Sequence, residues 1–402
     1  MAEGEFDESP QLIAGEDQPF FQSPATHVPV SFDLPIVEKK MTFEEASKCL
    51  TTLGKDESCI RYAYLMITAQ NRKLTDISVI INFRHVLFLD LTGNFLNLDA
   101  LQVLTGLPFL IMLKVSRNRV ESAALDTMHY LQELILNLNK IEETCDIAQP
   151  MLDTLDLGFN QIFTAQFDDE KLPNLKELSL KGNQLIDLSG SYPKSLEKLF
   201  IAENNITKIS SLVFSQMSHL TTLYLRDNQI KKLNGFSEFL TELRYLNLRN
   251  NSITKLRQFR KLSCLPQLET LIYTGNPVDE KNRLLEISGE KEDEENVEDE
   301  EAFGEGGGVK KATLDPIRIG VLVLLPNLKR INKAFVTFEE RDQAFLVKDT
   351  KFEEIMGELS SDEETEPPTT TYTSEIGEST ETESNFTDQE VIHGSRTYEE
   401  YN

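Results

Sequence analysis

The 402-residue sequence has only four cysteines, and no stretch of about 18 consecutive apolar residues occurs in it. Cys49, Cys59, Cys145 and Cys264 form no C-x-x-C pair, so their spacing excludes a zinc finger and a disulfide-rich scaffold. We therefore expect reduced thiols. The N-terminus is acidic and lacks the basic start and apolar run of a secretory signal. These absences argue against a secreted disulfide scaffold and a helical membrane protein, and they predict a soluble protein of the cytoplasm.

Basic residues are also scarce, because 40 Lys and Arg stand against 67 Asp and Glu, which gives a formal charge of −27. Nucleic acid backbone and anionic lipid carry the same sign of charge, so neither is an expected partner. Proteins are the expected partners. The acidic excess is uneven, since residues 1–41, 290–301 and 358–402 together carry −26 of the −27. A fold is expected in the nearly neutral remainder.

The chain between the first and last of these stretches contains one motif, L-x-x-L-x-L-x-x-N-x-L, nine times. The copies that begin at Leu175 and Leu220 have an apolar residue at every template position. This self-similarity predicts an α/β fold, a leucine-rich repeat solenoid. Successive asparagines are 21 to 25 residues apart, which is short for this architecture, so 3₁₀ turns and brief helices are expected on the convex side. The motif asparagines are Asn94, Asn118, Asn139, Asn160, Asn183, Asn204, Asn228, Asn251 and Asn276.

Each position of the motif has a physical role. The second and third leucines point inward from a short strand, and the residue between them faces outward. Strands of neighbouring repeats pair in parallel. Each buried Leu or Ile contributes roughly 1.5–3 kcal/mol, but one repeat cannot bury its own leucines without neighbours. The asparagine amide is expected to satisfy backbone groups of the turn after the strand, so the stacked repeats should form an asparagine ladder.

Such an array must cover its two ends, and the sequence predicts both caps. At the N-terminal end, Thr42 and Glu45 predict a capping box that begins a helix. Further on, Tyr64, Ile67 and Leu74 predict a degenerate repeat before the first full one. The apolar face of the predicted helix holds Phe43, Ala46, Leu50 and Leu53, before Gly54 ends it.

At the C-terminal end, residues 325–332 predict a last strand. The helix expected before it is interrupted by an acidic, glycine-rich insertion at 288–313, which has too few apolar residues to fold and should be a solvated loop. We therefore predict three regions: an acidic disordered arm at 1–41, a leucine-rich repeat domain with caps at 42–345, and an acidic disordered tail rich in Ser and Thr at 346–402.

No catalytic motif is present in the sequence. It contains no G-x-x-x-x-G-K-[ST], H-E-x-x-H, G-x-S-x-G or G-x-G-x-x-G pattern. The five histidines are isolated, and no EF-hand loop occurs. We therefore expect neither an enzyme nor a metal or cofactor site.

Binding is expected on the concave side, where the residues flanking each central leucine face outward. The late repeats place tyrosines and arginines there, which are types enriched at binding hot spots. The alternative is that these large side chains pack on one another and cover the sheet. The candidate protein-binding residues are Asp156, Phe159, Lys198, Phe200, Tyr224, Arg226, Tyr245 and Arg249.

In the tail, Ser360 and Ser361 precede a run of carboxylates. That pattern is typical of sites for an acid-directed kinase, so both serines are candidate phosphorylation sites. A tail that only keeps the protein soluble is the alternative.

Several segments are similar to one known family. They are residues 74–77, 220–230, 235–237 and 243–250, together with the C-terminal cap at 325–335 and the following Glu339-Glu340-Arg341. These segments resemble the leucine-rich repeat-containing protein 23 family, and the resemblance covers roughly residues 42–345. It implies a non-enzymatic component of the axonemal radial spoke of motile cilia and sperm flagella, in contact with radial spoke head and neck proteins.

Two other functions stay open at this stage. A regulatory subunit that docks a phosphatase or another signalling enzyme would also use short repeats with aromatic and acidic concave residues. An acidic nuclear chaperone of basic proteins is the second alternative, although such proteins favour purer Asp and Glu runs than those in this sequence.

Overall fold

The computed structural model describes residues 37–55, 60–279 and 315–356, with side chains described to residue 348. These residues belong to the first of two units, Met1–Glu358, and the second unit is Leu359–Asn402. The predicted insertion at 288–313, the serines Ser360 and Ser361, and most of the predicted arm and tail lie outside the described residues.

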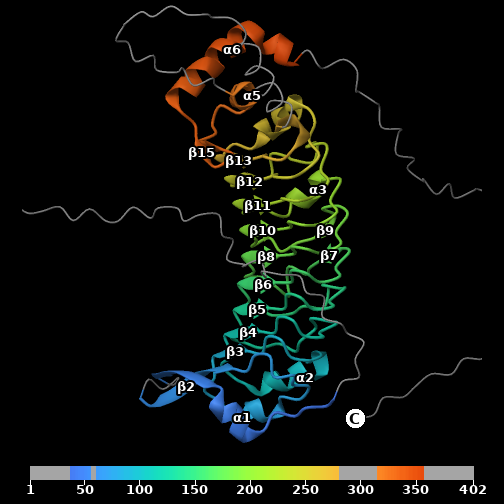
Figure 1. Ribbon diagram of the computed structural model, residues 1–402, viewed down its shortest axis with the longest axis vertical. Helices are drawn as coiled ribbons and strands as arrows, with labels where there is room; N and C mark the ends of the chain where they lie inside the picture. The colour runs from blue at the N-terminus through green and yellow to red at the C-terminus, as the bar shows by residue number, and fades with distance from the viewer. Residues whose placement is uncertain (1–36, 56–59, 280–314, 357–402) are drawn as a thin grey trace, which may run out of the picture. The chain divides into compact units, whose positions relative to one another are not determined.

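A single 13-stranded sheet runs through the described part of the array, with one short strand from each repeat (Figure 1). The nine repeats are confirmed, because their strands pair in parallel and in register, so that Leu199, Leu223 and Leu246 lie side by side. The strands are β3 (Phe88–Asp90), β4 (Met112–Lys114), β5 (Glu133–Ile135), β6 (Thr154–Asp156), β8 (Glu177–Ser179), β10 (Lys198–Phe200), β11 (Thr222–Tyr224), β12 (Tyr245–Asn247) and β13 (Thr270–Ile272).

The motif leucines form one continuous core along the array. Leu223 and Leu225 have no exposed surface, and neither do the equivalent leucines of the neighbouring repeats. On the other side of the core lie the 3₁₀ turns and brief helices predicted from the short repeats (Figure 1). They are η1 (Ser78–Asn82), α2 (Leu98–Gln102), η2 (Val103–Gly106), α3 (Ser211–Phe214) and η3 (Leu256–Cys264). This side also has a pair of short strands that was not predicted, β7 (Ala165–Gln166) and β9 (Gly190–Ser191).

The predicted asparagine ladder is present. Asn183 accepts a hydrogen bond at Oδ1 from the backbone N–H of Ile162 (3.1 Å), and its Nδ2 donates to the carbonyls of Leu157 and Leu180 (3.0 Å each). The other eight motif asparagines accept from the N–H at the same position of the preceding repeat. Each asparagine therefore links two repeats.

The N-terminal cap begins with the predicted helix, but this helix is shorter than predicted and a strand follows it. The capping box of Thr42 and Glu45 begins α1 (Phe43–Lys48). The prediction that Leu50 and Leu53 lie on this helix is wrong, because both belong to β1 (Leu50–Lys55). Leucines three residues apart fit a helix face, but here the chain leaves the helix at Cys49 and makes its hydrogen bonds with a second strand instead.

That second strand is β2 (Tyr62–Thr68), which pairs antiparallel with β1 and parallel with β3. Ile67 of β2 is fully buried beside Leu89 of β3. This pairing confirms the degenerate repeat predicted before the first full one, and it joins the cap to the sheet.

The C-terminal cap contains α5 (Pro316–Leu324), β14 (Arg330–Ile331), β15 (Ala334–Phe335) and α6 (Phe338–Met356). The predicted last strand is confirmed, because β14 pairs in parallel with β13. Helices α5 and α6 lie beyond β13 at the end of the array (Figure 1). Within the described residues, no helix has both the length and the apolar character needed to cross a membrane.

The repeat domain extends past the predicted limits of 42–345 at both ends. Met41 is buried, and its N–H donates to the carbonyl of Asp76 (2.9 Å). At the other end, α6 continues through the predicted boundary because Ala344 is buried and Val347 packs against the core. The predicted start of the tail at residue 346 is therefore wrong.

Candidate protein-binding face

We call the side of the sheet that points away from the core the open face. It is formed by the first and third residues of each strand, such as Thr222 and Tyr224 of β11, while the central Leu223 points into the core. This is the face that the sequence predicts to be concave and to bind partners. All of the candidate residues except Phe159 lie in the strands β6, β10, β11 and β12 or two residues after one of them.

Three candidate aromatic residues form a contiguous cluster, which we call the aromatic ladder. The ring centroids of Phe200 and Tyr224 are 4.9 Å apart, and those of Tyr224 and Tyr245 are also 4.9 Å apart. Phe200 is only 7% exposed, whereas Tyr224 and Tyr245 are half-buried. The rings thus pack on one another, as the alternative prediction states, and the two tyrosines still present surface to a partner.

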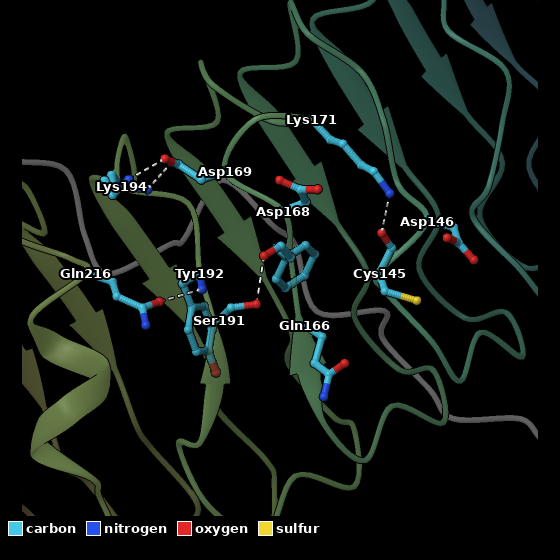
Figure 2. A pocket seen from close by; sticks show the side chains of 11 residues that line it. Cys145, Asp146, Gln166, Asp168, Asp169, Lys171, Ser191, Tyr192, Lys194 and Gln216 are labelled. Carbon is cyan, nitrogen blue, oxygen red and sulfur yellow. Dashed lines mark hydrogen bonds and ion pairs between the residues drawn. The ribbon is translucent and has the colours of Figure 1, made fainter.

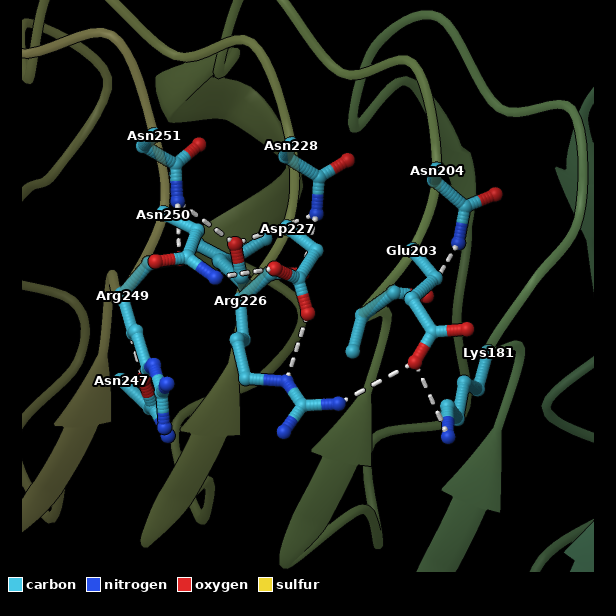
Figure 3. Close-up of polar contacts among 12 residues, drawn as sticks. Lys181, Glu203, Asn204, Arg226, Asp227, Asn228, Asn247, Arg249, Asn250 and Asn251 are labelled. Atoms are coloured by element: carbon cyan, nitrogen blue, oxygen red, sulfur yellow. Dashed lines mark hydrogen bonds and ion pairs between the residues drawn. The ribbon is translucent and has the colours of Figure 1, made fainter. Parts of the chain in front are cut away.

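A polar network follows the ends of these strands, and we call it the turn network (Figure 3). Glu203 accepts from Lys181 and from Arg226, both at 3.1 Å. The Nε of Arg226 also pairs with Asp227 at 2.7 Å. Asn250 donates to the other oxygen of Asp227 at 2.6 Å. Arg226 is therefore held by carboxylates of two repeats, and its side chain is about one-third exposed.

The backbone explains why these residues meet. The residue before each motif asparagine has a positive φ, for example 57° at Glu203, 56° at Asp227 and 52° at Asn250. From this position the side chain of Glu203 reaches cations of both neighbouring repeats, and that of Asn250 reaches Asp227 of the preceding repeat. Glu203, Asp227 and Asn250 were not predicted from the sequence, although their position immediately before the asparagine is a usable signal.

At Gly182 the same position requires glycine. Its φ is 67°, and a Cβ added there would lie 2.3 Å from the ring of Phe159. The candidate Phe159 occupies this space, and the Nζ of Lys181 lies 5.1 Å from its ring centroid. Phe159 is therefore half-buried between two repeats rather than part of the aromatic ladder.

The remaining cationic candidates flank the aromatic ladder. Lys198 is the first residue of β10 and forms an ion pair with Glu177 of β8. Arg249 lies two residues after β12 and is exposed. Together with Arg226, they give the late part of the open face a mixed surface of aromatic rings and cations.

Asp156 has a different environment from the one predicted. It is only 3% exposed, and both of its oxygens have partners: Oδ1 accepts from the N–H of Gly158 (2.9 Å) and Oδ2 accepts from the amide of Asn137 (3.0 Å). Burial raises the pKa of Asp156 above its ordinary value, and these hydrogen bonds only partly oppose that shift. Asp156 is therefore not available to a partner, and we correct its assignment to a structural role.

Replacing Asp156 by asparagine is expected to stabilise the fold at neutral pH. A carboxyl group whose pKa is raised by folding weakens the fold as the pH rises above its unfolded pKa, and the penalty is complete above the folded pKa. The buried Oδ1 of Asn137 makes no hydrogen bond among the described residues, so an amide flip lets it accept from the new side-chain amide at position 156.

We expect a gain on the order of 1 kcal/mol at pH 7 and almost none at pH 3.5. Urea unfolding of both proteins across this pH range measures the difference. A difference that does not change with pH would contradict the assigned titration.

A hollow of about 660 Å³ lies on the other side of the array, beside β7 and β9 (Figure 2). Its cations already have partners, since Lys194 pairs with Asp169 at 2.7 Å and Lys171 donates to the carbonyl of Cys145 at 3.1 Å. At its rim, Cys145 and Asp146 bring ligand atoms within 4.8 Å of Glu143. This small group is the only cluster of that kind among the described residues.

Comparison with known sequences identifies the class of protein to which this fold belongs. The family model described as Leucine rich repeat matches residues 194–253, and a second leucine rich repeat model matches residues 174–199. Together with the parallel sheet and the asparagine ladder, these matches define a leucine-rich repeat protein, a class of protein-interaction scaffolds.

The relatives narrow this class to one family. Leucine-rich repeat-containing protein 23 of Bos taurus is 36% identical over 272 residues, which cover 66% of this chain and 78% of the relative. The Homo sapiens protein of the same name is 32% identical over 328 residues, which cover 81% of this chain and 85% of the relative. The chain therefore belongs to the leucine-rich repeat-containing protein 23 family.

Among solved structures, a leucine-rich repeat protein of Leptospira interrogans aligns with a TM-score of 0.43 and 23% identity. The alignment covers 55% of this chain and 58% of that protein.

Proposed function

We propose that this protein is a non-enzymatic structural component of the axonemal radial spoke in motile cilia and sperm flagella. The observation that carries the proposal is membership of the leucine-rich repeat-containing protein 23 family, whose Homo sapiens member matches 81% of this chain. In this role the array is a rigid support, and its partners are neighbouring spoke head and neck proteins.

The aromatic ladder and the flanking cations are the proposed contact surface. Tyr224 and Tyr245 are large, half-buried and held by ring contacts, so little conformational entropy is lost when a partner covers them. Arg226 is positioned by the turn network, which reduces the same cost for its guanidinium group. Pre-positioned Tyr and Arg side chains are the usual composition of a binding hot spot.

Replacing Tyr224, Arg226, Tyr245 and Arg249 together by alanine is expected to abolish most partner binding. Loss of such a hot spot costs about 2–4 kcal/mol, which is roughly 30-fold to 1000-fold in Kd. The fold should lose about 1–4 kcal/mol, because the two lost ring contacts contribute about 0.5–1.5 kcal/mol each and the solvent-accessible Arg226 ion pairs add about 0–1 kcal/mol. Pull-down from axonemal extract and thermal unfolding measure the two effects.

A double variant of the early repeats, Met112→Ala with Thr154→Ala, is the matched control. Both residues are half-buried first residues of open-face strands, and their strands, β4 and β6, lie four and two strands before β10, where the aromatic ladder begins. Full capture of spoke proteins by the quadruple variant, or equal loss in the control, would place the contact surface elsewhere.

Localisation tests the spoke assignment itself. We expect the protein in the salt-resistant axoneme fraction of ciliated or spermatogenic cells, together with other radial spoke proteins. Uniform nuclear staining would favour the chaperone of basic proteins, and phosphatase activity that co-purifies with the protein would favour the regulatory subunit.

A further inference from the structure

The N-terminal arm has an unusual composition. Residues 1–36 contain seven carboxylates and no lysine or arginine. Within them, the adjacent Phe20 and Phe21 follow Glu16 and Asp17 and stand between two prolines, Pro19 and Pro24. The arm therefore carries two aromatic rings next to negative charge.

The late part of the open face has the complementary composition. Strands β8, β10, β11 and β12 and the four residues after each of them contain four cations and three acids, in a chain where acids outnumber cations 67 to 40. The cations lie in these strands or just after them, and all but Arg249 form ion pairs with Glu177, Glu203 or Asp227. They are Lys181, Lys198, Arg226 and Arg249.

The arm is long enough to reach this surface. It joins the described fold at Val37, and the N–H of Lys39 donates to the Thr75 hydroxyl at 2.9 Å in the N-terminal cap. From β2 to β11 there are seven strand spacings in the sheet, a distance of about 34 Å at about 4.8 Å per spacing. The 16 residues from Phe21 to Val37 span up to about 53 Å at about 3.3 Å per residue. This leaves about 19 Å for the path from Thr75, in the turn after β2, to the open face.

We propose that the N-terminal arm docks on the open face of its own chain, with Phe20 and Phe21 against Tyr224 and Tyr245 and the carboxylates Glu16 and Asp17 near Arg226 and Arg249. Aromatic rings pack face to edge or offset with an energy beyond their buried area. The carboxylates meet the part of the open face where cations outnumber acids. The arm is thus an internal competitor for the surface that the proposed function assigns to spoke partners.

The consequence is a regulated interface. A segment tethered within this reach has an effective concentration of about millimolar, so even weak docking is well populated. An arm that occupies the ladder about nine-tenths of the time lowers the apparent affinity of a partner about tenfold. Binding in the axoneme would then require displacement of the arm.

The absence of tryptophan from the sequence allows a direct test in the full-length protein. The variant Phe21→Trp has a single indole at the docking position. Phe6→Trp is the matched control, because Phe6 also stands among acidic residues of the arm but outside the Phe-Phe pair. We expect blue-shifted emission and a several-fold lower acrylamide quenching rate for Phe21→Trp than for Phe6→Trp.

Adding Tyr224→Ala and Tyr245→Ala should move the Phe21→Trp emission to the position seen for Phe6→Trp. Identical emission of the two variants, or emission that ignores the tyrosine substitutions, would overturn the proposal. A blue shift that appears only on raising the protein concentration would also overturn it, because it would assign the docked arm to a second copy of the chain.

A binding measurement separates this inference from the proposed function on which it rests. Phe20→Ala with Phe21→Ala should raise the apparent affinity for a captured spoke partner by up to about tenfold, while Phe6→Ala leaves it unchanged. The two fluorescence experiments can show no docking while the quadruple alanine variant still fails to capture spoke proteins. In that case the proposed contact surface is supported and the docking of the N-terminal arm is rejected. If the arm docks and no spoke protein binds, the docking stands and the spoke assignment fails.

Discussion

Replacing Leu223 by aspartate is expected to unfold the middle of the repeat array. Leu223 has no exposed surface and lies between Leu199 and Leu246 in adjacent strands. The change removes a buried leucine, which costs about 2–5 kcal/mol, and it introduces a carboxyl group that must stay charged at a cost of several kcal/mol or be protonated. The total approaches the roughly 5–15 kcal/mol that stabilises a typical domain.

We expect Leu223→Asp protein to lose its cooperative transition in circular dichroism and to be largely insoluble on expression. Thr222→Asp is the matched control, because Thr222 is the preceding residue of the same strand and its side chain lies on the open face. That protein should unfold near the wild-type midpoint. A soluble monomer of Leu223→Asp with the wild-type midpoint would show that the register of β11 is wrong.

The repeats could be predicted because every repeat makes its contacts in the same way. An inward leucine such as Leu223 is dictated by the period-2 alternation of a strand, and the asparagine contacts depend only on the next repeat. Nine strands, the asparagine ladder and the last strand of the C-terminal cap therefore follow from local spacing alone.

The caps were harder to predict, because a terminal repeat has only one neighbour. Leu50 and Leu53 are three residues apart, which fits a helix face, but pairing with the hairpin partner β2 places both in a strand. The extension of α6 past residue 345 depends on packing of Ala344 and Val347 against the core, which the acidic composition of the tail obscured.

On the open face, the sequence predicts which residue types are present but not how each side chain is held. Asp156 is buried with hydrogen-bonding partners in its own turn and in the preceding repeat, Gly158 and Asn137. Its place in the motif, which matches that of the half-buried Tyr224, does not reveal those partners. Similarly, Arg226 is predicted as a binding residue by type, but only the positive φ of Glu203 and Asp227 explains how it is held.

Replacing Asn183 by alanine is expected to have the second largest effect on stability, because this asparagine lies in the middle of the ladder. Among the described residues, the buried N–H of Ile162 donates only to Asn183 Oδ1, so the substitution leaves it without an acceptor. The two carbonyls to which Asn183 donates are less affected. The Leu157 carbonyl still accepts a hydrogen bond from the Asn160 amide, and the Leu180 carbonyl still accepts one from the Asn204 amide.

One orphaned N–H costs about 1–3 kcal/mol, and the lost hydrogen bonds add roughly 0.5–1.5 kcal/mol each, so we expect a loss of about 3 kcal/mol in the free energy of unfolding. Urea titration followed by circular dichroism measures it. Asn205→Ala is the control, because Asn205 is exposed and its side chain accepts a hydrogen bond from the exposed amide of Gln229.

Because neighbouring repeats stabilise one another, the Asn183→Ala transition should also broaden or split as the two halves of the array uncouple. Equal midpoints for the two variants would mean that backbone groups of the turn are satisfied without the ladder.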